Sequence, residues 1–242
     1  MGAFSFIKSI LPVRIKTPLR RLHDFISWDG WLVHSWSQEG EDQILRRIFE
    51  LKKNGFYVDI GAHHPQRFSN TFLFYKRGWR GINIDAMPGS MHLFNKIRPR
   101  DINLELGIGE QEGTLDYFMF DEPALNGFSI DLSGERNKAD SAYRIVGIIK
   151  VGVQPLQQVL DNYLPATQAI DFMSIDVEGF DFQVLKSNDW KKYRPKYVLV
   201  EFLGSSLHEI DQSDIGQFMR VAGYVLYAKC MSTVFFKESL SE

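Results

Sequence analysis

The sequence predicts an α/β fold built on a mostly parallel seven-stranded sheet, with helices on both faces and a closing antiparallel pair of strands. Two observations predict it. From residue 55 onward, short β-branched or aromatic runs alternate with segments of helical periodicity. Strands separated by helices need right-handed crossovers and therefore run parallel. Near residue 230, two strand-like runs follow one another without a helix between them, which predicts the antiparallel pair.

The individual elements follow from periodicity, length and turn residues. The strands expected in the sheet are 56–60, 81–85, 102–108, 171–176, 196–202, 224–229 and 233–237. The expected helices are 43–51, 69–77, 88–97, 155–163, 180–187 and 210–221. Residues 113–151 are less regular. They contain two strand-like runs, 115–120 and 145–151, joined by a polar loop at 122–140. The loop is long enough to be a lid over an acceptor, and disorder is the open alternative.

Length and composition fit one large domain. The chain has 242 residues, of which 44% are hydrophobic and 24% are charged, as in ordinary globular proteins. The formal net charge of -2 argues against nucleic-acid binding, and no apolar run reaches the ~20 residues of a membrane-spanning helix. Cys230 is the single cysteine of the sequence, which excludes an intramolecular disulfide and fits a reducing compartment. We therefore expect a cytoplasmic protein.

The N-terminal region differs from the rest in charge. Residues 1–23 carry five basic side chains and no acidic one, interspersed with apolar residues, and Pro12 and Pro18 break any long helix. We expect residues 1–34 to be an extension and residues 35–242 to be the domain. Two interpretations of the extension stay open. It contacts an anionic membrane at the inner surface or a lipid-linked substrate, or it packs on the domain or on a second subunit of a homo-oligomer.

The turn after the first strand indicates what the sheet binds. A dinucleotide-binding turn needs several glycines so that the backbone approaches a pyrophosphate, and here only Gly61 is present, with His63 and Pro65 following. A nucleoside without phosphates needs less, and S-adenosylmethionine is such a ligand. Asp85 ends the second strand, where an acid can accept hydrogen bonds from both hydroxyls of a ribose or can cap the next helix.

Four acids stand at the ends of four predicted strands. They are Asp59, Asp85, Asp176 and Glu201. Ligands of such sheets bind beyond the carboxyl ends of the strands, so four acids on one edge favour a binding site there, although each alone is also typical of a helix cap or a loop.

Several short segments together resemble a known family. They are Ser37–Asp42, Val58–Ala62, Ile84–Asp85, Ile175–Gly179 and Val184–Leu185. These segments resemble the FkbM family of S-adenosylmethionine-dependent methyltransferases, and the resemblance runs from about residue 35 to about residue 237. It implies a Rossmann-like methyltransferase fold, S-adenosylmethionine as cofactor and O-methylation of sugars, glycolipids or secondary metabolites. His63 and Pro65 stand where the common form of the family has Asn and Gly.

The motifs and the resemblance together give a set of expected site residues. Those expected to bind the cofactor are Asp59, Gly61, Ala62, His63, Asp85 and Asp42. For Asp42 a role in a lid over the cofactor and a role in starting the next helix stay open. The expected catalytic residues are Asp176, Glu201 and His208.

A hydroxyl acceptor needs a base or a metal, because an alcohol is a poor nucleophile at neutral pH. Asp176 is the first choice for this work, and Glu201 comes within reach of it if their strands are neighbours. His208 is an alternative base. Asp176 and Glu201 also suit Mg²⁺, which binds through one or two carboxylates. Glu178 either contributes to the site or caps the following helix.

The sequence thus predicts a methyltransferase that acts on a hydroxyl of a small molecule or glycan. Two alternatives are an NAD-dependent sugar oxidoreductase, which the glycine-poor turn disfavours, and a non-catalytic binding module on the same fold, which the set of acids disfavours.

Overall fold

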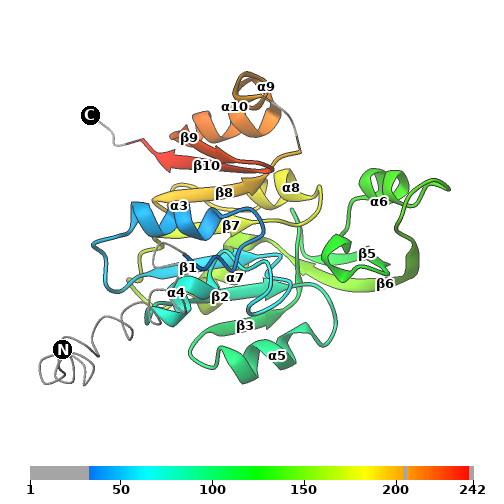
Figure 1. Cartoon of the computed structure of the whole chain (residues 1–242), viewed down its shortest axis with the longest axis horizontal. Coiled ribbons are helices and arrows are strands. Elements are labelled where there is room, and N and C mark those ends of the chain that lie inside the picture. The colour runs from blue at the N-terminus through cyan, green and yellow to red at the C-terminus, as the bar shows by residue number, and fades with distance from the viewer. Residues whose placement is uncertain (1–32, 204–205, 240–242) are drawn as a thin grey trace, which may run out of the picture. The chain divides into compact units, whose positions relative to one another are not determined.

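The computed structural model describes residues 33–203 and 206–239. Its main element is a seven-stranded sheet in the order β3-β2-β1-β7-β8-β10-β9 (Figure 1). The strands of this sheet are β1 (Phe56–Ile60), β2 (Arg80–Asp85), β3 (Ile102–Glu105), β7 (Phe172–Ile175), β8 (Tyr197–Glu201), β9 (Tyr224–Cys230) and β10 (Thr233–Glu238). The predicted extension, residues 1–34, falls outside the described residues except for its last two, so it stays a prediction.

The directions of the strands confirm the predicted sheet. β3, β2, β1, β7 and β8 run parallel to one another, and β10 is antiparallel to both β8 and β9. The chain builds β1, β2 and β3 toward one edge and then returns to place β7 on the other side of β1. The strand order therefore reverses between β1 and β7. In open α/β sheets, ligands bind beyond the carboxyl ends of the strands at this point.

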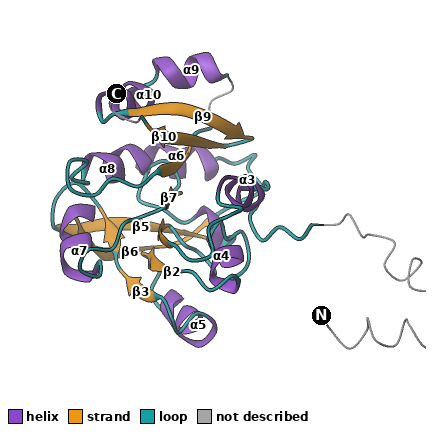
Figure 2. Cartoon of the chain, turned by 90° about the vertical axis from the view of Figure 1, so that its left-hand side faces the viewer, coloured by secondary structure: helices purple, strands orange, loops and turns teal. Residues whose placement is uncertain are grey.

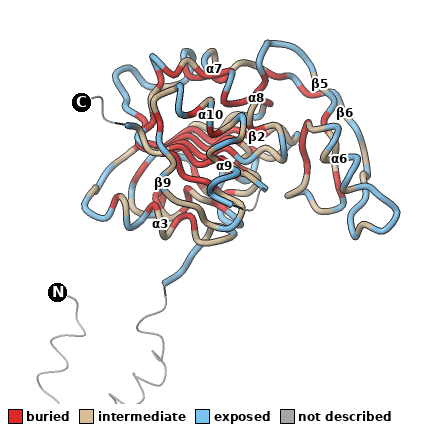
Figure 3. The backbone as a smooth tube through the Cα atoms, turned by 90° about the horizontal axis from the view of Figure 1, so that it is seen from above, coloured by how far each residue is buried: buried red, intermediate tan, exposed pale blue. Residues whose placement is uncertain are grey.

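Helices cover both faces of the sheet, because its central strands are apolar on both sides (Figure 2). On one face, Val58 and Ile60 of β1 belong to a core with α7, α8 and α10. On the other face, Tyr57 belongs to an aromatic core with α3 and α4. The helices are α3 (Glu41–Ile48), α4 (Phe72–Lys76), α5 (Ser90–Ile97), α7 (Leu156–Tyr163), α8 (Asp181–Lys186), α9 (Leu207–Gln212) and α10 (Asp214–Val221). Figure 3 shows the buried strands in the middle of the domain.

Residues 107–154 form an insertion with a sheet of its own. It contains β4 (Gly107–Ile108), β5 (Gly113–Phe120), the 3-10 helix η1 (Pro123–Leu125), α6 (Ile130–Arg136) and β6 (Ile145–Gln154). The strand order is β4-β6-β5, and β5 and β6 pair antiparallel. The insertion projects beyond the carboxyl ends of the parallel strands (Figure 1). It therefore lies on the side of the sheet where ligands are expected.

Three predicted elements differ from the observed ones. Residues 102–108 are two strands in two sheets, β3 and β4, because the chain leaves the main sheet after Glu105. The polar loop at 122–140 contains α6, whose first turn is capped by the Ser129 hydroxyl accepting from the Leu132 amide. The helix expected at 210–221 is two helices, because Ser213 ends α9 in an extended conformation and its hydroxyl caps α10.

The helices within residues 33–203 and 206–239 include none that is long and apolar enough to cross a membrane. Their boundaries otherwise lie within a few residues of the expected ones. α3, for example, begins at Glu41, two residues before the expected start.

The turns after β1 and β7 touch each other. Gly61 has a φ of 80°, and a Cβ built on it would lie 1.7 Å from the carbonyl oxygen of Asp176. The amide of Asp176 in turn donates to the carbonyl oxygen of Ile60 over 3.0 Å. Only glycine fits at position 61, because any side chain would overlap backbone atoms.

This contact predicts different costs for two glycine substitutions. Gly78 also has a positive φ, of 95°, but a Cβ there would meet nothing within 4 Å. We expect G78A to lower the free energy of unfolding by about 1–2 kcal/mol through backbone strain alone. G61A adds the overlap with Asp176, and we expect it to cost more than about 4 kcal/mol or to prevent folding. Urea denaturation compares the two variants, and equal losses would contradict the close approach.

Candidate active site

Two adjoining cavities open at the carboxyl ends of the strands. The first lies between the ends of β1 and β2 and the insertion, and its lining includes Gly61, His63, Asp85, Tyr117, Asn126 and Phe128. The second has a volume of about 380 Å³, and its lining includes Glu39, Glu41, Arg67, Arg136, Tyr143 and Glu201. Asp176 and Glu178 line both cavities. A group held in the first cavity can therefore meet a group held in the second beside these two carboxylates.

The first cavity has the features expected of a nucleoside site. The Asp85 carboxylate accepts from the His63 amide over 2.8 Å and from the Met87 amide over 2.9 Å, which fixes its orientation. Each of its oxygens keeps a lone pair for a further donor. Burial raises the pKa of Asp85, and the two backbone amides oppose that shift. A pair of ribose hydroxyls fits such a fixed acceptor.

His63 presents a neutral imidazole beside this cavity. Its backbone has a φ of 51°, and its Nε2 is buried without a hydrogen-bond partner among the described residues. Burial and the nearby Arg67 charge lower the pKa of His63. A buried nitrogen without a partner is costly, which is a reason to expect that a ligand of the first cavity bonds to it.

Three residues expected at the cofactor lie behind the cavity wall instead. Asp59 is buried on the α4 side of β1 and accepts from the Thr71 hydroxyl over 2.6 Å. Ala62 packs against Met91 and Phe94 of α5. None of Asp59, Ala62 and Asp42 is among the residues that line either cavity.

Asp42 organises the loop that precedes α3. Its buried carboxylate accepts from the Ser35 hydroxyl over 2.7 Å and from the Trp36 amide over 2.8 Å. This loop carries Gln38, which lines both cavities. Asp42 therefore shapes the wall of the site from behind.

His208 lies away from both cavities. It is exposed on the first turn of α9, which begins with a capping box between Ser206 and Glu209. The buried residue of this helix is Ile210, two positions on, which points about 200° around the helix axis. His208 therefore faces solvent, and its position gives no support to the expectation that it acts as a base.

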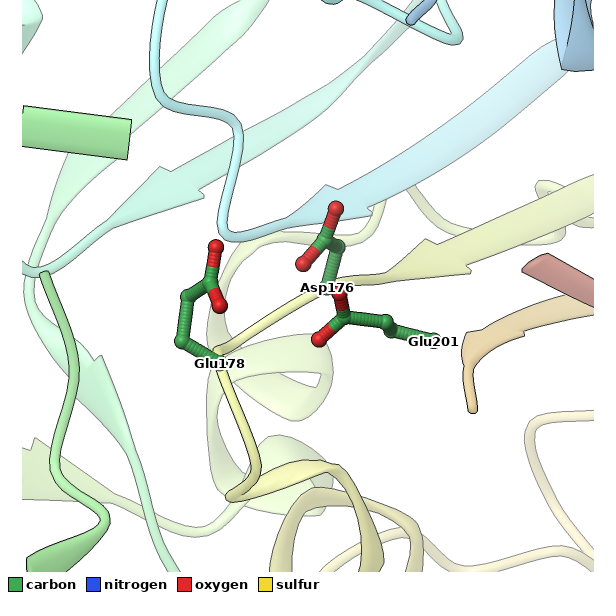
Figure 4. Close-up of side chains that lie close together, drawn as sticks. All are labelled: Asp176, Glu178 and Glu201. Atoms are coloured by element: carbon green, nitrogen blue, oxygen red, sulfur yellow. The ribbon is translucent and has the colours of Figure 1, made fainter. Parts of the chain in front are cut away.

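Asp176, Glu178 and Glu201 form a carboxylate cluster (Figure 4). One carboxylate oxygen from each lies within 4.8 Å of the others. Asp176 follows β7 and Glu201 ends β8, and these two strands are neighbours that pair in parallel, which is the condition for the two acids to meet. The structure thus brings together the two acids that the sequence singled out and adds Glu178.

The cluster holds its protons more tightly than ordinary carboxyl groups do. Asp176 is open to the cavities, but its removal from bulk water and the charges of Glu201 and Glu178 raise its pKa well above the usual value. Burial and the charge of Glu178 raise the pKa of Glu201 to about 8. A carboxyl group titrating near neutral pH can accept a proton from an acceptor hydroxyl.

Glu178 is the member with a cationic partner. Its carboxylate lies 2.6 Å from the Arg136 guanidinium, which comes from α6 of the insertion. Its backbone has a φ of 55°, and the Asp181 carboxylate holds this turn by accepting from the amides of Val177 and Gly179. The insertion and the turn after β7 therefore fix Glu178 from two sides.

Sequence reasoning missed the contributions of the insertion. Tyr117 and Phe128 line the first cavity and Tyr143 lines the second, and nothing in their local sequence distinguishes them from other aromatic residues. Asn126 and Arg136 belong to the loop at 122–140, for which the sequence left a lid and disorder open. The sequence did not indicate which cavity each would reach.

Comparison with known proteins gives a family and a loose likeness to solved structures. Residues 59–226 match the model of the methyltransferase FkbM domain. No curated protein matches the chain. A TehB-like SAM-dependent methyltransferase from Corynebacterium glutamicum has 10% sequence identity and a TM-score of 0.42, with 95% of this chain and 100% of that chain covered.

Two further solved structures are similarly distant. A putative O-methyltransferase from Klebsiella pneumoniae has 11% identity and a TM-score of 0.43, with 98% of this chain and 95% of that chain covered. An O-methyltransferase from Bacillus cereus in complex with SAH has 10% identity and a TM-score of 0.38, with 95% of this chain and 93% of that chain covered. Superpositions this loose say nothing about the acceptor.

The family match spans most of the chain and includes both turns that form the site. It decides between the alternatives left open by the sequence, against an oxidoreductase and against a non-catalytic module. The chain therefore belongs to the FkbM methyltransferase family, and its reaction is methyl transfer from S-adenosylmethionine.

Proposed function

We propose that this protein O-methylates a hydroxyl group of a sugar, glycan or related metabolite. The observation that carries the proposal is the position of Asp176, which lines both cavities and belongs to the carboxylate cluster. A proton acceptor at the junction of a cofactor cavity and an acceptor cavity suits the methylation of a neutral oxygen nucleophile.

The first cavity is the proposed site of S-adenosylmethionine, which supplies a methyl group on a positively charged sulfur. Asp85 accepts from the ribose hydroxyls, and His63 offers its buried Nε2. Gly61 has no side chain, so the turn after β1 lies directly against the turn that carries Asp176. The end of the cavity at Asp176 then holds the reacting part of the cofactor.

The second cavity is the proposed acceptor site. Its lining includes the carboxylates of Glu39, Glu41 and Glu122, which can accept hydrogen bonds from several hydroxyl groups. Phe68 and Tyr143 line the same cavity and are 40% and 41% exposed. Aromatic side chains beside many hydrogen-bond acceptors suit the apolar face and the hydroxyl rim of a sugar ring.

The transfer itself is an in-line displacement. The acceptor oxygen forms a bond to the methyl carbon as the carbon–sulfur bond breaks, and S-adenosylhomocysteine leaves as a neutral thioether. The proton of the acceptor hydroxyl passes to Asp176, with Glu201 as its neighbour in the cluster. Alignment of the two reactants can contribute ~7–11 kcal/mol, and a positioned base ~10²–10⁴-fold in rate.

The carboxylate cluster also fits a divalent cation. Three oxygen ligands lie within 4.8 Å of one another, and their mutual repulsion is opposed by the charge of Arg136 on Glu178. Asp176 and Glu201 would hold Mg²⁺, with Glu178 as a third ligand, and the ion would lower the pKa of an acceptor hydroxyl. The residues of the two cavities would orient the cofactor and the acceptor in the same way with or without the ion.

Loss of the Asp176 carboxylate tests the proposed base. We expect D176N to reduce methyl transfer by about 10²–10⁴-fold, because the acceptor proton has no destination. The affinity for S-adenosylmethionine should change less than about threefold, since the amide keeps the size of the side chain. Transfer of labelled methyl groups to the host's glycans and lipid-linked sugars measures the activity, and calorimetry measures the affinity for S-adenosylmethionine. D116N, at an exposed acid of β5, is the control, and full activity of D176N would remove Asp176 from the mechanism.

The raised pKa of Glu201 predicts a dependence of stability on pH. Its folded-state pKa of about 8 lies above the usual 4.5, so between these values the folded carboxyl keeps a proton that the unfolded one has lost. Stability contributed by this group therefore falls as the pH rises from about 4.5 to 8.

We expect E201Q to remove that loss, because an amide does not ionise. The free energy of unfolding of E201Q minus that of the wild type should be larger at pH 8.5 than at pH 5, as urea denaturation in the presence of a chelator would show. An unchanged difference between the two proteins at both pH values would contradict the raised pKa.

Metal binding is tested with Mg²⁺ alone. We expect the wild type to bind Mg²⁺ in calorimetric titrations and E201Q to bind it at least about tenfold more weakly. E50Q, at an exposed glutamate beyond α3, should bind as the wild type does. Absence of binding to the wild type would reject the cation and leave Asp176 as the direct base.

A further inference from the structure

The insertion lines the first cavity with a group of buried side chains. Tyr117 and Asn126 are 5% and 8% exposed, and Phe128 beside them is 7% exposed. All three line the cavity together with Gly61 and Asp85. The ring of Tyr117 packs on Phe128 with 4.9 Å between the ring centroids, which limits its movement.

The orientation of Asn126 is set by the backbone. Its Oδ1 accepts from the Phe120 amide over 2.7 Å, so the amide oxygen already has a donor. The Nδ2 atom contacts the Met87 sulfur at 3.6 Å, and the Asn126 side chain acts on the neighbouring Tyr117 hydroxyl to lower its pKa. Reversing the side-chain amide would leave the Phe120 amide facing another donor.

Tyr117 is thereby left as a hydrogen-bond donor. The Asn126 side chain lowers the pKa of Tyr117, as a donor beside the phenolic oxygen does, and the phenolic hydrogen remains to be donated. Burial and the charge of Asp85 raise the pKa of Tyr117, so the phenol keeps its hydrogen at any physiological pH.

The two sides of the cavity are complementary in hydrogen bonding. Asp85 only accepts, so ribose hydroxyls that donate to it still have oxygen lone pairs to satisfy. Tyr117 faces the same cavity and offers the missing donor. One hydroxyl bonded by both residues would have its donor and its acceptor functions used.

We propose that Tyr117 donates its phenolic hydrogen bond to a ribose hydroxyl of S-adenosylmethionine and that Asn126 is the positioning residue that directs it. This inference rests on the proposed location of the cofactor in the first cavity. It makes the insertion part of the cofactor site and adds a donor to the acceptor supplied by Asp85 at the end of β2.

The first experiment is calorimetric binding of S-adenosylhomocysteine to Y117F. The substitution keeps the ring and its packing on Phe128 and removes only the hydroxyl. We expect about 3- to 10-fold weaker binding, the effect of one buried hydrogen bond. Y163F removes a hydroxyl from an exposed tyrosine at the end of α7, which lines neither cavity, and should bind as the wild type does. Wild-type affinity of Y117F would overturn the proposal.

Deoxyribose analogues separate the ribose from other contacts. Against the 2′-deoxy and 3′-deoxy forms of S-adenosylhomocysteine, the loss caused by Y117F should disappear for the form that lacks the bonded hydroxyl. A loss that persists with both analogues would mean that Tyr117 acts elsewhere, and the proposal would fail.

The role of Asn126 is tested by N126D. A carboxylate still accepts from the Phe120 amide but would also accept the phenolic hydrogen, which turns Tyr117 away from the ligand. We expect weaker binding in N126D and no additional loss in the double variant with Y117F. Additive losses would contradict the positioning role.

Melting temperatures confirm that each variant is folded. Failure of the wild type to bind S-adenosylhomocysteine would refute the cofactor site itself, and a normal wild type with an unaffected Y117F would refute only the role of Tyr117.

Discussion

The contact between Gly61 and the carbonyl oxygen of Asp176 is the constraint on which the site depends. The two turns follow β1 and β7, which are neighbours in the sheet although 111 residues of the chain lie between them. Their closeness arises from the reversal of strand order. Because position 61 carries no side chain, the turn that faces the first cavity lies directly against the turn that carries Asp176. One residue can then line both cavities, and cofactor and acceptor can share a boundary.

The charge of the carboxylate cluster bears on how catalysis works. The sulfonium of the cofactor is cationic before transfer and neutral after it, so a carboxylate acting mainly on the sulfur would stabilise the ground state more than the transition state. The same carboxylate acting on the acceptor hydroxyl stabilises the transition state more than the ground state, because the oxygen loses its proton during the transfer. The raised pKa values of Asp176 and Glu201 fit the second role, because a weakly acidic carboxyl group is a better proton acceptor.

Much of the main sheet could be predicted from sequence because its signals are local. β1 is a five-residue strand with the predicted bounds, and the strands that end near Asp176 and Glu201 are neighbours. The break at Ser213 was missed because a single serine inside an apolar pattern is also tolerated in a helix. α6 was missed because its seven residues include Gly134 and three charged residues and show little apolar periodicity. Tyr117 comes to line one cavity with Asp85, and Arg136 pairs with Glu178, only after the insertion has folded across the ends of the strands.

The shared cavity and the ion pair link folding of the insertion to assembly of the site. Arg136 reaches the carboxylate cluster, and Tyr117 reaches the first cavity, from different elements of the same insertion. Gly127 supports the same arrangement, since a Cβ there would lie 3.1 Å from the Cβ of Glu178. An insertion held against the turn after β7 by a close backbone approach and an ion pair cannot move away without altering both cavities. The main sheet therefore supplies the acidic residues. The insertion supplies the Arg136 guanidinium, which orients Glu178, and the buried donors that complement Asp85.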